Sequence, residues 1–182
     1  MEHLYPLLFE PNLHETVWGG KKLTTWKHLP EHAAPVGESW EVSAVPSSIN
    51  IIANGDFKGM DLVSLINRYP TEILGEHVAK QYKGQMPLLV KFIDARDDLS
   101  IQVHPNDEMA QRVHGKFGKS EMWYIIDADP EASLYVGFKQ EIDENEYKQR
   151  IADGTITDVL ARHKVHAGDV FYGGRELDFL RR

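Results

Sequence analysis

Short alternating or continuous apolar segments dominate the pattern of this chain. Residues 40–45 alternate polar and apolar positions and 50–53 form a short apolar run, and both patterns are typical of strands. Residues 88–93 are almost continuously apolar, which predicts a strand covered on both faces. Four further segments also predict strands: 99–103, 121–126, 133–137 and 168–172.

Helical spacing is confined to short segments between these strands. Five helices are predicted, at 61–67 with Asp61 as the cap, at 71–80, at 106–114, at 143–152 before Gly154, and at 157–162. Residues 1–40 are rich in glycine and proline, so they are expected to be irregular with short strands. The pattern lacks the βαβ repeat of a parallel sheet, and it predicts a mainly β domain with helical insertions, a small barrel or sandwich.

Composition narrows the function classes. The 182 residues suit one domain, and a formal charge of -8 argues against a nucleic-acid partner. Without cysteine, thiolate metal sites and a cysteine nucleophile are excluded. The first residues lack the pattern of a signal peptide, and no apolar run approaches the ~20 residues that span a bilayer. We therefore expect a cytoplasmic protein with no membrane partner.

A candidate metal site combines three residues from two predicted strands. Gln102 and His104 are two positions apart, so they project from the same face of a strand that Pro105 ends. Glu121 stands near the start of a later strand. An amide oxygen, an imidazole nitrogen and a carboxylate oxygen suit zinc or another borderline cation. An isolated Gln-X-His pair on a strand is, however, more often a coincidence than a metal site.

This ligand set would leave a net positive charge at the metal. With one carboxylate, a zinc site keeps about one net positive charge, which can polarise a carbonyl or hydroxyl and stabilise an enediolate. Lys91 lies in an apolar strand, and Lys119 precedes Glu121 by two positions. Each lysine is a candidate for binding phosphate or assisting proton transfer. Trp18 is a candidate pocket wall for the substrate.

Five segments in order carry a family resemblance. They are Val17-Trp18-Gly19-Gly20, the Gly-Glu-Ser-Trp-Glu-Val-Ser of 37–43, the Pro-Leu-Leu-Val-Lys-Phe-Ile-Asp-Ala of 87–95, the Leu-Ser-Ile-Gln-Val-His-Pro of 99–105 and the Gly-Lys-Ser-Glu-Met-Trp-Tyr of 118–124. The chain resembles type I mannose-6-phosphate isomerase in its short bacterial form, over about residues 5–172.

The resemblance implies a fold, a cofactor and a reaction. The fold would be a cupin (RmlC-like) jelly-roll β-barrel that holds zinc. The reaction would interconvert mannose 6-phosphate and fructose 6-phosphate through a cis-enediol, with a sugar phosphate as the small-molecule partner. Gln102, His104 and Glu121 match three of the family's four zinc ligands. Lys91 and Lys119 match lysines of its active-site pocket and are the catalytic candidates.

The resemblance ends near the C-terminus. In the family, a Pro-Ala-Gly-Arg-Val-His-Ala turn with the fourth ligand follows the Gly-Asp-Val-Phe-Tyr strand, but here residues 173–182 have another sequence. Val165-His166-Ala167 precedes that strand and is not equivalent. We therefore expect one catalytic domain over 1–182 that lacks the C-terminal strands of its barrel. Glu176 or a neighbouring chain would supply the fourth ligand, and unpaired strand edges predict a homo-oligomer.

Two alternatives remain beside the isomerase. The first is a catalytically inactive module of the same fold that binds sugar phosphates or another partner. The second is an iron or manganese oxygenase of the cupin type, whose histidine-rich sites Gln102 fits poorly. Turnover separates the isomerase from the inactive module, and the identity of the bound metal separates it from the oxygenase.

Overall fold

The computed structural model describes residues 3–100, 102, 104–115, 117–173 and 179–181. The chain divides into two compact units, Met1–Arg96 and Asp97–Arg182, and each is described by itself. The expected single domain over 1–182 stays a prediction.

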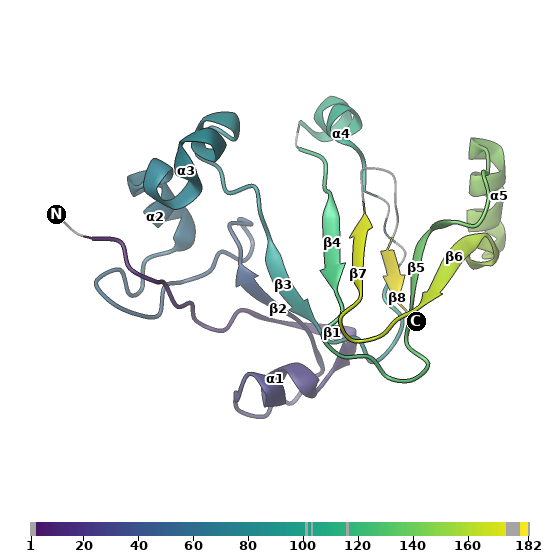
Figure 1. Ribbon diagram of the computed structural model, residues 1–182, viewed down its shortest axis with the longest axis horizontal. Coiled ribbons are helices and arrows are strands. Elements are labelled where there is room, and N and C mark those ends of the chain that lie inside the picture. The colour runs from purple at the N-terminus through teal and green to yellow at the C-terminus, as the bar shows by residue number, and fades with distance from the viewer. Residues whose placement is uncertain (1–2, 101, 103, 116, 174–178, 182) are drawn as a thin grey trace. The chain divides into compact units, whose positions relative to one another are not determined.

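An antiparallel sheet forms the centre of the first unit. Its strands are β1 (Leu13–Gly20), β2 (Val36–Val42) and β3 (Val90–Ile93), in the order β1-β2-β3 (Figure 1). The interpretation of 88–93 as a strand covered on both faces is wrong, because Leu88 is 56% exposed and Val90 39% exposed. The strand starts only at Val90, so Leu88 precedes the sheet.

One short helix is fixed to the end of this sheet by a carboxylate. Helix α1 (Lys22–Trp26) follows β1 directly, and Asp94 lies just beyond β3. Asp94 Oδ2 accepts hydrogen bonds from the backbone N–H of Lys22 at 2.6 Å and of Leu23 at 3.3 Å. These bonds satisfy N–H groups that a helix start leaves without partners. Residues 1–40 are thus more regular than expected, since β1 has eight residues.

A helical hairpin and a small apolar core complete the first unit. Helices α2 (Leu62–Arg68) and α3 (Pro70–Gln81) confirm the two predicted there, and α3 is kinked at Gly75. Leu65 packs with Ile52 and Phe57 in the core. The predicted strand at 50–53 is present only as isolated bridges, at Ile51 and Ile52.

Helix α2 is capped as the sequence predicts, and this cap gives a testable pH dependence. Asp61 accepts hydrogen bonds from the backbone N–H of Ser64 at 2.8 Å and from its hydroxyl at 2.6 Å. These bonds, the hydroxyl one first, lower the pKa of Asp61. Asp61→Ala is therefore expected to lower the free energy of unfolding by about 1 kcal/mol at neutral pH.

The stabilisation by Asp61 is fully present above the pKa of the unfolded chain, about 3.9, and disappears as the pH falls through the lowered pKa of the folded chain. Urea unfolding of the wild type and of Asp61→Ala at pH 7 and in steps below pH 4 measures this. Asp61→Asn is the matched control, because its amide oxygen still accepts a bond while it has no charge to titrate. A gap between the wild type and Asp61→Ala that widens in acid contradicts the prediction.

The second unit contains two antiparallel sheets. In one, β4 (Glu121–Tyr124) pairs with β7 (Val170–Gly173), and in the other β5 (Ser133–Phe138) lies between β6 (Leu160–Lys164) and β8 (Phe179–Arg181) (Figure 1). Ala132, Leu134 and Val165 form the buried core of the unit. Its helical segments are α4 (Asp107–His114), α5 (Glu144–Asp153) and the 3-10 turn η1 (Ile156–Asp158).

The positions of α4 and α5 were predicted correctly from their cap residues. Asn106 and Asp143 accept hydrogen bonds from the first turns, and Gly115 and Gly154 end the helices in the left-handed conformation. The predicted helix at 157–162 is wrong beyond η1. Strand β6 begins at Leu160, which is buried and pairs with β5, so tertiary pairing overrides the local pattern.

The described strands form separate antiparallel sheets and no closed barrel. Helices and strands both make up the described residues, so the architecture is mixed sheets with helices. The jelly-roll barrel and the loss of its last strands stay predictions. No helix within the described residues has the length and apolar character needed to cross a bilayer.

Candidate functional site

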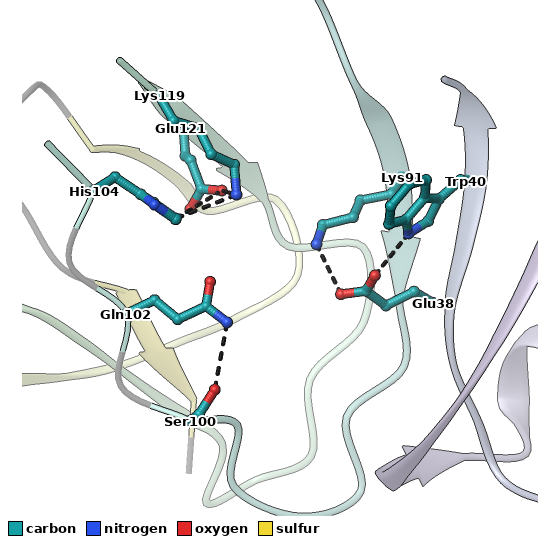
Figure 2. Close-up of polar contacts among 8 residues, drawn as sticks. All are labelled: Glu38, Trp40, Lys91, Ser100, Gln102, His104, Lys119 and Glu121. Atoms are coloured by element: carbon teal, nitrogen blue, oxygen red, sulfur yellow. Dashed lines mark hydrogen bonds and ion pairs between the residues drawn. The ribbon is translucent and has the colours of Figure 1, made fainter. Parts of the chain in front are cut away.

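Three of the predicted site residues meet in the second unit. Lys119 Nζ lies 2.7 Å from Glu121 Oε1 and 3.2 Å from His104 Nε2 (Figure 2). The same two acceptor atoms, His104 Nε2 and Glu121 Oε1, are 3.6 Å apart. The His104 and Glu121 side chains are only 22% and 18% exposed, so both are held by their surroundings. One cationic group therefore bridges an imidazole and a carboxylate.

The contact with Lys119 suits the form of the imidazole in which Nε2 carries no hydrogen. An ammonium group has only hydrogens to donate, so a hydrogen bond from Lys119 requires an unprotonated Nε2 on His104. A neutral imidazole with a free Nε2 lone pair is also the form that binds a metal ion.

The start of α4 brings these residues together. Asp107 Oδ1 accepts a hydrogen bond of 2.9 Å from the backbone N–H of Gly118. A Cβ atom on Gly118 would lie 2.7 Å from the carbonyl oxygen of Pro105, so only glycine permits this close approach. Pro105 follows His104 and Gly118 precedes Lys119, and this contact therefore places the two functional segments next to each other.

Strand β4 anchors Glu121. Successive residues alternate between faces, so Glu121 shares a face with Trp123, which packs against the buried core of the unit. Met122 and Tyr124 point to the other face and are 67% and 60% exposed. Glu121 is paired with Gly173 of β7. The carboxylate is thus carried by a strand whose orientation the core determines.

Gln102 lies in the same unit but is held less firmly. Its Nε2 is 3.4 Å from Ser100 Oγ, a long hydrogen bond, and the residue is exposed. In the view of Figure 2 its amide oxygen is turned away from Ser100. Gln102 makes an isolated bridge, while positions 101 and 103 of the predicted strand lie outside the described residues, as does Glu176.

The donor set fits a small divalent cation. Two bonds of ~2.0–2.2 Å to one zinc ion span at most about 4.4 Å, and the 3.6 Å between His104 Nε2 and Glu121 Oε1 is within that span. Among the described residues, no three histidine, aspartate or glutamate side chains converge on one point. The amide oxygen of Gln102 as a third ligand stays a prediction, since the one hydrogen bond of its side chain within the described part of the chain is to Ser100.

The first unit contains the other two predicted residues. Lys91 Nζ donates a 2.7 Å hydrogen bond to Glu38 Oε1, and Trp40 Nε1 donates one of 2.7 Å to Glu38 Oε2 (Figure 2). A carboxylate therefore holds and offsets the charge of Lys91. Trp18 lies in β1 and its ring covers Gly37, where a Cβ atom would be 2.6 Å from Trp18 Cζ3. Trp18 is thus a packing residue of the sheet in this structure.

Sequence reasoning missed the role of Glu38. Alternation along β2 places Glu38 and Trp40 on one face and Ser39 and Glu41 on the other. On the second face Lys27 Nζ donates to Ser39 Oγ at 3.0 Å and forms an ion pair with Glu41. Glutamates at 38 and 41 of a predicted strand could have indicated this, since partly buried carboxylates require cationic partners.

Comparison with known proteins assigns the chain to a family. A family model described as the phosphomannose isomerase type I catalytic domain matches residues 7–131. The chain belongs to this family. The family resemblance in its motifs is thereby confirmed.

Several relatives and a solved structure support the assignment. The chain is 35% identical to "Mannose-6-phosphate isomerase" from Streptococcus mutans, over 92% of this chain and 51% of the relative. It is 37% identical to "Mannose-6-phosphate isomerase ManA" from Bacillus subtilis, with the same coverage of each chain. The crystal structure of a Bacillus subtilis mannose 6-phosphate isomerase superposes with a TM-score of 0.81 at 30% identity, over 97% of this chain and 58% of that one. The chain spans about half the length of the curated relatives it matches.

Proposed function

We propose that this chain is an aldose–ketose isomerase that interconverts mannose 6-phosphate and fructose 6-phosphate. The observation that carries the proposal is that His104 Nε2 and Glu121 Oε1 both contact the ammonium group of Lys119, in a chain that belongs to the type I family. The named activity of the relatives supports the choice of substrate. The activity named for these relatives favours the isomerase over the inactive module and over an oxygenase.

Zinc is the proposed cofactor, held by Gln102, His104 and Glu121. When bound, it supplies Lewis-acid polarisation of substrate oxygens. A fourth ligand at Glu176 or from a neighbouring chain, a cytoplasmic location and a homo-oligomer belong to the same proposal. The cupin barrel is the proposed fold of the complete domain.

The lysines perform the remaining steps in this proposal. Lys119, beside the metal-binding residues, holds or moves the proton that is exchanged between C1 and C2 of the sugar through a cis-enediol. Lys91 binds the phosphate or another anionic group, with Glu38 holding its ammonium in a defined orientation. Trp18 is the proposed wall of the substrate pocket.

A rate assay on metal-stripped protein tests the proposal. Conversion of mannose 6-phosphate to fructose 6-phosphate is measured with no metal, with zinc, and with iron or manganese. We expect zinc to raise the rate by about 100-fold or more, because a metal ion would stabilise the negative charge that develops on the substrate oxygens. No turnover at saturating zinc, in a sample that binds the metal, would favour the inactive module. Turnover only with iron or manganese would contradict the choice of zinc.

A further inference from the structure

We propose that Lys119 acts as an internal substitute for the metal ion, occupying the cation position between His104 and Glu121 until a divalent cation displaces it. The inference rests on the proposed metal site. It concerns how the metal-free chain keeps that site formed, and what metal binding does to Lys119.

The contacts of the ammonium group carry the argument. Lys119 Nζ is within hydrogen-bond distance of both proposed metal-ligand atoms, 2.7 Å from Glu121 Oε1 and 3.2 Å from His104 Nε2. The two atoms are 3.6 Å apart, and when Nε2 carries a lone pair it and the carboxylate repel each other, so a nearby positive charge stabilises their approach. The ammonium therefore supplies the charge and the hydrogen bonds that hold the two side chains in a metal-ready arrangement.

A metal ion and this ammonium cannot both bind His104 Nε2. A neutral imidazole has one acceptor nitrogen, so a cation bonded to His104 Nε2 at ~2.0–2.1 Å excludes the Lys119 hydrogen bond to that atom. The carboxylate of Glu121 has further lone pairs, so there only the two positive charges compete. The two positive charges would also repel each other at close range. Binding is thus an exchange in which the metal enters and the ammonium leaves, with no bond made or broken other than coordination and hydrogen bonds.

The Lys119 side chain can move into solvent when a metal ion displaces it. The Lys119 side chain is 43% exposed, while those of His104 and Glu121 are much less exposed, so the ammonium can swing towards solvent as its two partners stay. Lys119 also precedes β4, so its movement does not disturb the strand that carries Glu121. Metal entry would therefore release Lys119 from an internal ion pair and make its ammonium available to an anionic substrate.

Zinc affinity, measured by competition with a chromophoric chelator, tests the exchange without any activity assay. Lys119→Met keeps an unbranched side chain, one atom shorter, and removes the competing charge. We expect it to bind zinc about tenfold more tightly than the wild type. Lys164→Met is the matched control, since it removes the same charge from an exposed pair with Glu131 in the same unit, and its zinc affinity should stay within about twofold of wild type.

A crystal structure of the zinc-loaded wild type separates displacement from simple repulsion at a distance. Displacement requires Lys119 Nζ to be beyond hydrogen-bond distance of His104 Nε2 and Glu121 Oε1. Lys119 still in contact with both atoms beside a bound zinc, or equal zinc affinities for Lys119→Met and wild type, would overturn this inference alone. Folded proteins that both fail to bind zinc would overturn the inference together with the proposed cofactor.

Discussion

Replacing His104 with alanine is expected to weaken zinc binding by about 100-fold or more. His104 Nε2 is the one nitrogen among the proposed ligands, and the other two are a carboxylate oxygen on Glu121 and a neutral amide oxygen on Gln102. Losing the imidazole leaves these two oxygens with the proposed fourth ligand, a poorer set for zinc. Titration of zinc against a competing chelator, with elemental analysis of the dialysed protein, measures the change.

His114→Ala is the matched control for this prediction. His114 is an exposed residue in the last turn of α4 in the same unit, so its removal takes away one imidazole without touching the proposed site. We expect wild-type zinc affinity for that variant. Stoichiometric zinc retained by His104→Ala would show that the ligand assignment is wrong, and a parallel loss in both variants would indicate non-specific binding to surface histidines.

Local signals in the sequence predicted the helices well. The caps Asp61, Asn106 and Asp143 and the left-handed Gly154 act within one turn of the chain, so the residues that determine them are neighbours in the sequence. Strand assignments were weaker. Whether 157–162 is helix or strand depends on pairing with β5, more than twenty residues away, and the apolar run at 88–93 carries no information about what covers it.

In the site, too, the features that depend on contacts between distant residues could not be predicted. The sequence placed His104 and Glu121 in one predicted set, and the structure brings these two side chains into contact, while Gln102 as the third member stays a prediction. The position of Lys119 between two of them was not predictable, because it depends on the close approach of Gly118 to the start of α4. The need of Glu38 for a cationic partner was predictable, but the identity of that partner was not, since Lys91 is 53 residues away.

The pair formed by Glu38 and Lys91 leads to the second large effect that we expect. Glu38→Leu should lower the free energy of unfolding by about 2 kcal/mol, because it leaves the Lys91 ammonium and the Trp40 N–H without their shared acceptor. The Glu38 and Lys91 side chains are 15% and 24% exposed, so water replaces the lost carboxylate only in part. Urea unfolding followed by tryptophan fluorescence, to which Trp40 contributes, measures the loss as a change in the unfolding equilibrium of about 30-fold.

A double variant determines whether the pair or the packing is responsible. In Glu38→Leu with Lys91→Met, no charge is left half-buried, so most of the lost stability should return even though the ion pair is absent. Lys91→Met alone should cost less than Glu38→Leu, since Glu38 would still accept the bond from Trp40. If the double variant is as unstable as Glu38→Leu, the loss comes from the packing of residue 38 or from the Trp40 N–H without its acceptor, and not from the charge of Lys91. If stability returns in the double variant, the charge of Lys91 depends on Glu38 for its place in the fold, and any anion that Lys91 binds must compete with that carboxylate.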